Sequence, residues 1–354
     1  MPQYNRFTLN KQEVEEVREA KVQVEEDFLG KIEPPAHVVG MGVGVKWKDG
    51  QATGEPSLLV FVTHKVDKSQ LSAKDLIPDK LADMQTDVVS IGTPVIESER
   101  LTVTHPLAQS SGNVLNSRVR PVKGGWSVGH KAITAGTVAT CVYELLPGAR
   151  KTPAEPGLGI PAKYYILSNN HVLANSNEAS LGDAILQPGP YDGGKQEEDT
   201  VAHLSRFIPI QLDPPTPRGQ HANLVDAAIA EAPFHELDRE IHWIGRVRGW
   251  RRKENVTVGM LVQKTGRTTC YTTGRIMSVD TTIDVGFGGG KVARFKDQIV
   301  TTNISAGGDS GSLVTTLDNI AIGLLFAGSA QATVLNQIEN VRSLLGIEVA
   351  EEVL

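Results

Sequence analysis

The stretch Gly307-Gly308-Asp309-Ser310-Gly311-Ser312 lies late in the chain, between the apolar, β-branched runs 300–304 and 313–315. A serine on a tight turn between such runs has an exposed hydroxyl, and glycines on both sides let the backbone approach a bound molecule closely. The glycines also leave peptide N–H groups free to point at one spot, as an oxyanion hole requires. Because strand-like residues follow, the turn differs from the strand-to-helix elbow of α/β-hydrolases. A plain glycine-rich hairpin is the alternative interpretation of this stretch.

The chain around this turn, from residue 124 onward, alternates short β-type runs with Gly/Pro-rich loops. Many short strands with few helices predict a sandwich or a barrel. The expected strands are 132–143, 164–167, 184–187, 201–210, 226–230, 261–264, 274–279, 292–295, 299–303, 312–316 and 320–326. The pattern changes near the end, where apolar residues recur at helical spacing from Leu335 to Leu345 and Gly346 provides a stop.

The first part of the chain has a different character. Residues 10–30 predict a helix that begins at Asn10, with Glu13 as its capping-box partner, and that packs on its own domain or on another subunit. We also expect strands at 38–47, 58–62 and 86–91, a turn over 48–56 and a partly helical segment at 71–81. Glycines at 40, 42 and 44 leave one face of the first strand bare for close packing. The sequence therefore predicts an α+β domain over 1–97 and a polar linker over 98–120.

Composition and charge limit the classes of function. A chain of 354 residues suits two or three domains, and a net charge of -6 argues against general affinity for nucleic acid. No apolar run approaches the length of a membrane span, and the N-terminus lacks an apolar signal core. Two cysteines, Cys141 and Cys270, cannot form a disulfide framework, and the sequence leaves open whether they pair. We expect a cytoplasmic protein without a membrane segment, a metal or a cofactor.

Ser310 needs a base, because a serine hydroxyl is a poor nucleophile until an imidazole takes its proton. Of the nine histidines, His171 stands apart, since the apolar run 164–167 ends in small polar residues and delivers it at a strand end. The histidine in turn needs a carboxylate that fixes its tautomer. Asp226 is a lone acid among small apolar residues, and an unpaired buried carboxylate is costly, so we expect His171 as its partner. An acid on an edge strand in water is the alternative.

Three motifs, 166–171, 226–229 and 308–312, follow one another in the order His, Asp, Ser and resemble the chymotrypsin/trypsin-like serine proteases. Within that clan the chain looks most similar to intracellular trypsin-like peptidases, which include the plant narrow-leaf protease and its bacterial relatives. This closer likeness also covers Val119 through Thr137, Lys264 through Thr269 and the glycine-rich N-terminal domain, and therefore most of the chain.

The resemblance implies a mainly β fold with two six-stranded β-barrels, preceded by the small α+β domain and ending in a short C-terminal helix. The first barrel is expected over residues 121–240 and the second over 241–354. The active site is then expected in the cleft between the barrels, with the histidine and the aspartate from the first and the serine from the second.

The same resemblance assigns roles to single residues. His171, held by Asp226, would deprotonate Ser310, and water would release the acyl-enzyme. The main-chain N–H groups of Gly308 and Ser310 would form the oxyanion hole. In secreted relatives the acid at the position of Asp309 pairs with a new N-terminus after zymogen cleavage, and no apolar terminus of that type is present here. How Asp309 is satisfied is left open, and so is a resting state in which a partner or a signal must open the oxyanion loop.

Substrate selection is also inferred from the resemblance. Ile304, six residues before the nucleophile, would form the base of the primary pocket, while Ala327 and Gly328 would bind the substrate backbone on the strand 323–328. An apolar base disfavours lysine or arginine. The likeness therefore predicts a small or apolar residue before the cut.

Together these features predict an intracellular serine endopeptidase, a hydrolase, that acts on protein or peptide substrates. The rival is a catalytically silent binding or scaffold protein on a protease fold, and an esterase with the same acyl chemistry is a third candidate. Oligomers in the resembled group favour a homo-oligomer, with a regulatory protein as a further partner. The basic, Trp-bearing run 246–253 is expected to be an inter-barrel connection or a subunit contact rather than a nucleic-acid site.

Overall fold

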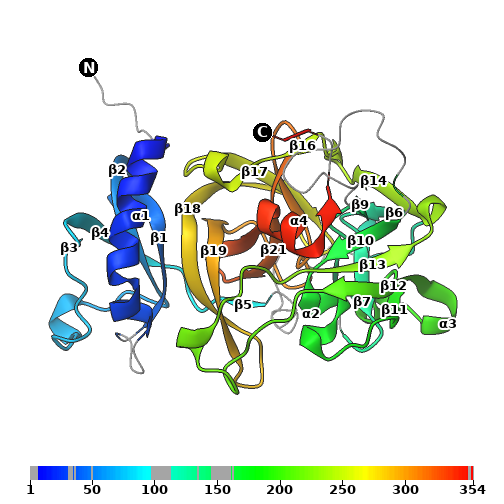
Figure 1. Cartoon of the computed structure of the whole chain (residues 1–354), viewed down its shortest axis with the longest axis horizontal. Helices are drawn as coiled ribbons and strands as arrows, with labels where there is room; N and C mark the ends of the chain where they lie inside the picture. The colour runs from blue at the N-terminus through cyan, green and yellow to red at the C-terminus, as the bar shows by residue number, and fades with distance from the viewer. Residues whose placement is uncertain are drawn as a thin grey trace.

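The computed structural model describes residues 7–30, 35, 37–48, 51–96, 113–133, 135–144, 161, 163–349 and 352–353. The protein is mainly β. Figure 1 shows an N-terminal unit, a central β-barrel and a second β-rich lobe side by side. Within the described residues no helix combines the length and the apolar character needed to cross a membrane.

The central lobe is a closed barrel from the second half of the chain. Its strands are β17 (Leu261–Gly266), β18 (Cys270–Gly286), β19 (Val292–Thr302), β20 (Leu313–Thr316), β21 (Ile320–Gly328) and β22 (Ala332–Gln337). They pair in the order β17-β20-β21-β22-β19-β18, and β17 also pairs with β18, which closes the ring. Inward-facing Val262, Ile276, Val314 and Leu325 pack together in its core, and closure gives each of the six strands a partner on both sides over part of its length.

The other lobe is the barrel from the first half of the chain. Its strands are β7 (Ser127–His130), β8 (Gly136–Thr137), β9 (Cys141–Glu144), β10 (Tyr164–Ser168), β11 (Ala184–Leu186), β12 (Thr200–Phe207) and β13 (Ala228–Ala232), in the order β9-β10-β13-β12-β11-β7-β8. β8 and β9 are two parts of one segment, and Ala139 between them donates to Leu167 on β10 at 2.9 Å, so this sheet also closes. The predicted double six-stranded barrel is confirmed.

The N-terminal unit contains α1 (Lys11–Glu25), a π-helical turn (Glu26–Gly30), β1 (Val38–Lys48), β2 (Gln51–Val62), β3 (Lys80–Leu81), β4 (Met84–Ser90) and β5 (Val95–Ile96). Asn10 caps α1 in the predicted capping box with Glu13. β1 pairs antiparallel with β18, so this sheet is continuous with the central barrel. A Cβ on Gly42 would lie 2.2 Å from the Ser278 hydroxyl, so β18 packs too closely against β1 to leave room for a side chain at this position.

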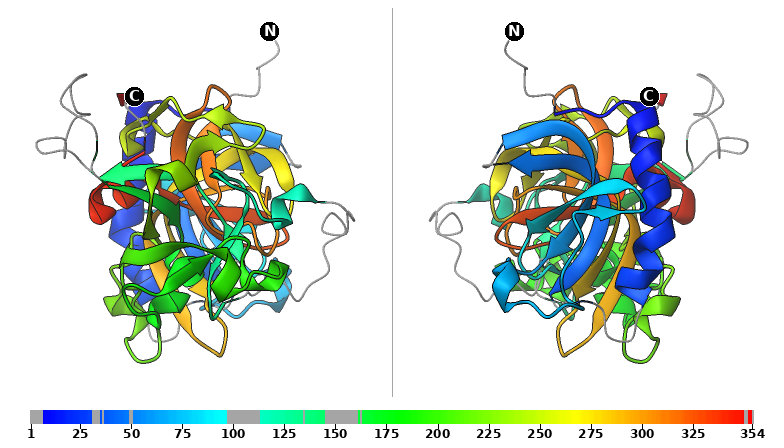
Figure 2. Two further views of the ribbon diagram at one scale, coloured as in Figure 1. Left: turned by 90° about the vertical axis from the view of Figure 1, so that its right-hand side faces the viewer. Right: turned by 90° about the vertical axis from the view of Figure 1, so that its left-hand side faces the viewer.

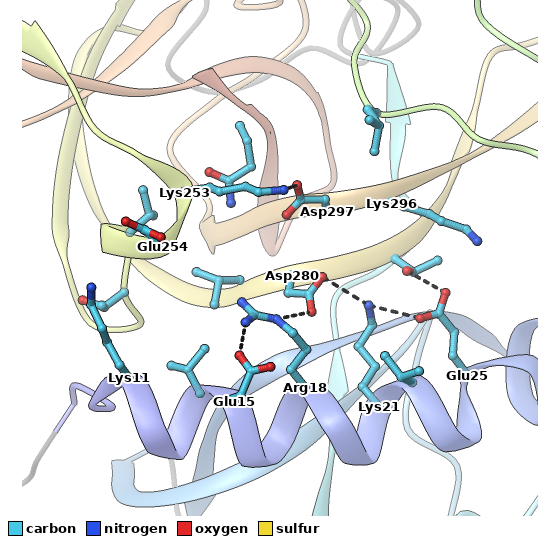
Figure 3. Close-up of a pocket in the computed structure, with 18 of the residues that line it drawn as sticks. Lys11, Glu15, Arg18, Lys21, Glu25, Lys253, Glu254, Asp280, Lys296 and Asp297 are labelled. Atoms are coloured by element: carbon cyan, nitrogen blue, oxygen red, sulfur yellow. Dashed lines mark hydrogen bonds and ion pairs between the residues drawn. The ribbon is translucent and has the colours of Figure 1, made fainter. Parts of the chain in front are cut away.

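The helix α1 lies along the strands β1 and β2, as the right-hand view of Figure 2 shows, and also faces the central barrel. Figure 3 shows that face: Arg18 pairs with Asp280 on β18 at 3.0 Å, and the buried Lys21 lies 3.1 Å from Glu25 and 3.6 Å from Asp280. These ion pairs surround a cavity of about 960 Å³. The helix therefore packs on its own chain, as one of the two alternatives predicted.

The remaining described elements connect or cover these units. They are β6 (Val122–Gly124), α2 (Asn170–Leu173), α3 (Gln196–Asp199), β14 (Leu237–Ile241), β15 (Gly245–Arg246), β16 (Gly249–Trp250), α4 (Ile338–Leu345), β23 (Ile347–Glu348) and β24 (Glu352–Val353), with 3-10 turns at Lys68–Gln70, Val114–Asn116, Asn175–Asn177, Pro190–Asp192, Arg218–Gln220, Phe234–Glu236 and Lys253–Asn255. Trp250 is buried under the Arg342 guanidinium, 4.8 Å from the ring centroid. The basic run 246–253 therefore presents no exposed aromatic ring. Most of the predicted linker, residues 98–112, lies outside the described residues.

Several predicted boundaries are wrong. Residues 71–81 contain turns and the short β3 instead of a partial helix, because Ser72 and Asp75 close a turn and Pro78 follows. The C-terminal helix begins at Ile338 rather than near Leu335, which lies on β22. Sheet pairing overrides local helical periodicity there. The predicted 48–56 turn is shorter, since β2 already begins at Gln51.

Candidate active site

His171 is held by the end of one strand and the loop before another. β10 ends at Ser168, and the next turn forms α2, which carries the histidine. Asp226 lies two residues before β13 rather than on it, and the Asn169 amide donates to its carbonyl at 2.7 Å. β10 and β13 are adjacent and antiparallel, so the end of the first lies beside the start of the second. Neighbouring strands thus bring together two residues that are distant in sequence.

The two side chains form a buried pair. His171 Nδ1 lies 2.6 Å from Asp226 Oδ2, and the backbone N–H of His171 donates to Oδ1 at 3.1 Å. Both side chains are 0% exposed. A carboxylate facing Nδ1 assigns the ring hydrogen to that nitrogen and leaves a lone pair on Nε2.

The Nε2 atom of His171 is buried and has no hydrogen-bond partner among the described residues. Its nearest ring neighbour is Phe287, edge-on with the centroids 6.4 Å apart. An unpaired buried polar atom is rare and calls for an explanation. A nitrogen held in one tautomer and kept free of partners can accept a proton from a group placed beside it.

Ser310 comes from the turn before β20 and is fully buried. Its hydroxyl donates to the Phe326 carbonyl on β21 at 3.3 Å rather than to His171. Its own carbonyl accepts from the Thr137 N–H on β8 at 2.7 Å, and a Cβ on Gly136 would contact both the Ser310 carbonyl and Val172. The serine turn of one barrel therefore lies against the segment next to His171 in the other.

The peptide between Gly307 and Gly308 is oriented by its carbonyl, which accepts from the Thr268 hydroxyl at 2.7 Å. Gly308 has φ +97°, a conformation that suits glycine, and its own carbonyl accepts from the Thr137 hydroxyl at 2.9 Å. In a trans peptide the N–H points away from the carbonyl. The Gly308 N–H thus points away from Thr268 and, within the described chain, donates to no acceptor.

The peptide between Asp309 and Ser310 is oriented in the same way. The Asp309 carbonyl accepts from the N–H of Ser312 at 3.0 Å and from its hydroxyl at 2.6 Å. The N–H of Ser310 points to the opposite side and has no acceptor in the part of the chain that the structure describes. Two unpaired N–H groups from one anchored turn, at Gly308 and Ser310, form the donor arrangement that an oxyanion hole needs.

The Asp309 side chain, which the sequence left without a partner, has a saturated set of donors. The N–H groups of Thr268, Thr269 and Ala306 donate to it at 2.9, 3.2 and 3.0 Å, and the Thr269 hydroxyl does so at 2.6 Å. The ammonium of Lys264, fully buried on β17, lies 3.3 Å away. Burial alone would raise the pKa of Asp309, but Lys264 and these hydrogen bonds hold that pKa below its ordinary value.

The residues predicted to bind substrate are placed as follows. Ile304 is 3% exposed and packs in the core of the central barrel, where a Cβ on Gly274 would lie 2.4 Å from its Cγ2. Beside it the hydroxyls of Ser305 and Thr333 are 2.8 Å apart. Ala327 and Gly328 are buried on β21, between β22 and β5.

Sequence reasoning missed three supporting residues. Lys264 neutralises Asp309, while Thr268 and Thr137 fix the carbonyls of the serine turn. The signal for Lys264 was a lone cation within the predicted strand 261–264, because a charge buried on a strand requires a partner. Nothing local marked the two threonines. Among the described residues no group of three or more His, Cys, Asp or Glu side chains is placed to hold a metal. Cys141 and Cys270 are free.

Comparisons with known proteins add the following. Residues 31–91 match the family model of the NARROW LEAF 1 N-terminal domain. No curated protein matches the chain. Solved structures similar to it include Thermobifida fusca protease A, at 14% identity and TM-score 0.43, covering 65% of this chain and 99% of that one. Cellulomonas bogoriensis chymotrypsin is 14% identical with a TM-score of 0.43, and the match covers 65% of this chain and 99% of that one. A glutamic acid-specific serine protease is 18% identical with a TM-score of 0.42, and the match covers 64% of this chain and 99% of that one. Scores this low carry no argument about activity.

Proposed function

We propose that the protein is a serine endopeptidase in which Ser310 is the nucleophile, His171 the general base and Asp226 the residue that orients the base. The N–H groups of Gly308 and Ser310 are proposed to bind the oxyanion. The observation that carries this proposal is the buried His171–Asp226 contact of 2.6 Å, which leaves Nε2 without a partner. A buried acid–imidazole pair with one free nitrogen is the arrangement that activates a serine.

The proposed reaction is acyl transfer in two steps. The Ser310 hydroxyl leaves the Phe326 carbonyl, transfers its proton to His171 Nε2 and attacks the scissile carbonyl, forming an ester and releasing the amine with that proton. Water then attacks the ester and gives a proton to the same base; the bond to Ser310 breaks, the acid product leaves and the proton returns to the Ser310 oxygen. The negative charge of each tetrahedral intermediate falls on the oxygen that faces the N–H groups of Gly308 and Ser310. These donors are anchored before substrate arrives, so little reorganisation accompanies the reaction.

Protein or peptide substrates are proposed because the edge of β21 beside the nucleophile, which pairs with β5 in this structure, has the extended backbone that a peptide strand can pair with. Specificity for a small or apolar residue before the cut rests on Ile304 and remains a prediction. It can be measured with a peptide series that varies this residue, and fastest cleavage after arginine or lysine would contradict it. The Ser305–Thr333 hydroxyl pair, which adjoins Ile304, is a polar group to include in such a study.

A catalytically silent scaffold is the second candidate. It is favoured by one observation, the hydrogen bond of the Ser310 hydroxyl to Phe326 in place of His171. Hydrogen bonds in a site without substrate are often long or misdirected, however, and tighten when substrate binds.

A fluorophosphonate probe separates the two candidates. We expect labelling of the wild type and its loss in Ser310→Ala, and no labelling under any condition would favour the scaffold. Cleavage of peptides by the wild type should fall by about a millionfold in Ser310→Ala. Turnover of esters without turnover of peptides would instead identify an esterase.

Membership of the narrow-leaf type is part of the proposal and is supported by the match over residues 31–91. A cytoplasmic location and a homo-oligomer, with a regulatory partner, also remain predictions. Cell fractionation and light scattering measure them.

A further inference from the structure

One edge of β21 carries both the serine turn and a segment from the N-terminal unit. Along this edge, Leu325 pairs with Gly311 and Ser312, and the Phe326 carbonyl faces the Ser310 hydroxyl. The next two residues, Ala327 and Gly328, pair with β5 (Val95–Ile96). Figure 1 shows β5 as a short cyan strand beside the central barrel, at the end of the segment that comes from the N-terminal unit. The segment therefore lies on the same strand edge as the nucleophile, immediately beyond it.

The direction of β5 matches that of an extended substrate. The pairing is antiparallel, with Val95 opposite Gly328 and Ile96 opposite Ala327. The chain of β5 therefore runs toward the Phe326 carbonyl and the Ser310 hydroxyl. A peptide that adds a strand to an exposed edge uses the same main-chain hydrogen bonds. β22 pairs with the other side of these two residues, so while β5 is in place no further backbone can pair with them.

Side chains and backbone both hold the segment. Ile96 is 3% exposed and packs with Phe326, Ala327 and Phe287. Phe287 is the ring that lies edge-on to His171. The Pro94 carbonyl accepts from the N–H of Gly286 on β18 at 2.9 Å. Further back, the Ser329 hydroxyl donates to the Ile91 carbonyl.

We propose that β5 is a built-in pseudosubstrate: it occupies the part of β21 that a protein substrate needs, and turnover requires it to leave. The inference rests on the proposed function and adds its regulation. The site is thereby restrained at the substrate edge, while the oxyanion donors are already oriented. Because only two residues pair, the contact can open locally without unfolding of either barrel. A competing segment raises the apparent KM in inverse proportion to the open fraction and leaves kcat unchanged.

A disulfide can lock β5 in place. A Cβ built on Gly286 would lie 4.0 Å from the Val95 Cβ, within the usual range of disulfide geometry. Gly286 has no positive φ, and it lies outside the proposed catalytic and substrate-binding residues. The variant is Val95→Cys/Gly286→Cys, with each single substitution as a control and peptide mapping to identify the bridge.

Two measurements separate the reactivity of Ser310 from the access of a peptide backbone to the edge of β21. Diisopropyl phosphorofluoridate has no peptide backbone, so its reaction with Ser310 should proceed at the same rate in the oxidised and reduced forms. Hydrolysis of an unstructured peptide should be at least tenfold slower in the oxidised form and should recover with reductant. Equal hydrolysis by both forms would overturn the pseudosubstrate. Absence of labelling in every form would refute the proposed function, and this inference with it.

The opposite change should release the segment. Ile96→Asp places a charge in an apolar cluster, so it disfavours docking and should lower KM for peptides about tenfold at constant kcat. Val22→Asp on α1, where the side chain is 70% exposed, is the matched control and should change nothing. A raised KM in Ile96→Asp with labelling intact would mean that β5 helps to bind substrate, and would overturn the proposal.

Discussion

Asp226 in the first barrel and Asp309 in the second are both fully buried, but their surroundings differ in kind. Asp309 accepts from three backbone N–H groups, a hydroxyl and an ammonium, all fixed by the fold. Asp226 faces His171, whose outer nitrogen is unpaired. The saturated site holds a loop in shape, whereas in the proposed mechanism the unsaturated one keeps His171 Nε2 available for proton transfer. Burial of an acid thus has two uses, and the pairing of the neighbouring atoms tells them apart.

Asp226→Asn tests this comparison with the largest expected effect. An amide can donate to Nδ1 and so favours the tautomer with the hydrogen on Nε2, which cannot accept the serine proton. We expect kcat/KM for peptides to fall about ten-thousandfold with little change in thermal stability. The control is Asp183→Asn, because Asp183 pairs with His130 at 3.1 Å elsewhere in the first barrel. An equal loss in both variants would remove the distinction.

Lys264→Met tests the saturated site. Removal of the ammonium leaves a buried carboxylate without its counter-charge and should cost about 3–5 kcal/mol of unfolding free energy in chemical denaturation. Adding Asp309→Asn should restore part of that loss. Lys253→Met is the control, since Lys253 pairs with Asp297 at 2.8 Å on the surface, and it should cost less than about 1 kcal/mol. An unchanged free energy of unfolding in Lys264→Met would mean that the hydrogen bonds alone stabilise Asp309.

Gly308→Ala tests the oxyanion donors. Its φ of +97° strains alanine, and the added Cβ would lie 2.5 Å from the Thr268 hydroxyl that anchors the turn. Displacement of this N–H should lower kcat about a hundred- to thousandfold. Gly289→Ala also has a positive φ, but its Cβ meets nothing within 4 Å. That control should lose about 1 kcal/mol of stability at unchanged kcat, and a normal kcat in Gly308→Ala would exclude this amide from the site.

The smallest effect is the response of stability to acid. Lys264 and the hydrogen bonds outweigh burial and hold the pKa of Asp309 below 3.8, its ordinary value in an unfolded chain. The ionised carboxylate therefore stabilises the fold fully above about pH 3.8, and this contribution is lost as the pH falls through the lower folded-state pKa. The stability gap between wild type and Asp309→Asn should narrow below that pH in urea titrations. A gap that widens would contradict the sign.

Much of the architecture could be predicted from local patterns, because short alternating runs and glycine turns mark strands one by one. The helix at 10–30 followed from Asn10 and Glu13, whose reciprocal hydrogen bonds are purely local. Leu335 was misassigned, because its helical spacing is real but its pairing with Leu325 on β21 is not visible in the chain order. The triad candidates His171, Asp226 and Ser310 were predicted from their local settings, and their order along the chain supplied the resemblance. The short distance between His171 and Asp226 results from the pairing of β10 with β13, which the sequence does not show.

The sequence by itself determined the shape of the serine turn, where Gly308 and Gly311 adopt positive φ, and the strand character around it. Only the tertiary structure decided which groups complete that turn, since Thr137 and Lys264 reach it from other strands and Thr268 from the turn between β17 and β18. The same is true of β5, whose two residues carry no local mark of a pseudosubstrate. The reason is physical. The alternation of residues along a strand is local and can be recognised in the sequence, but which edge the strand pairs with depends on closure of the whole sheet.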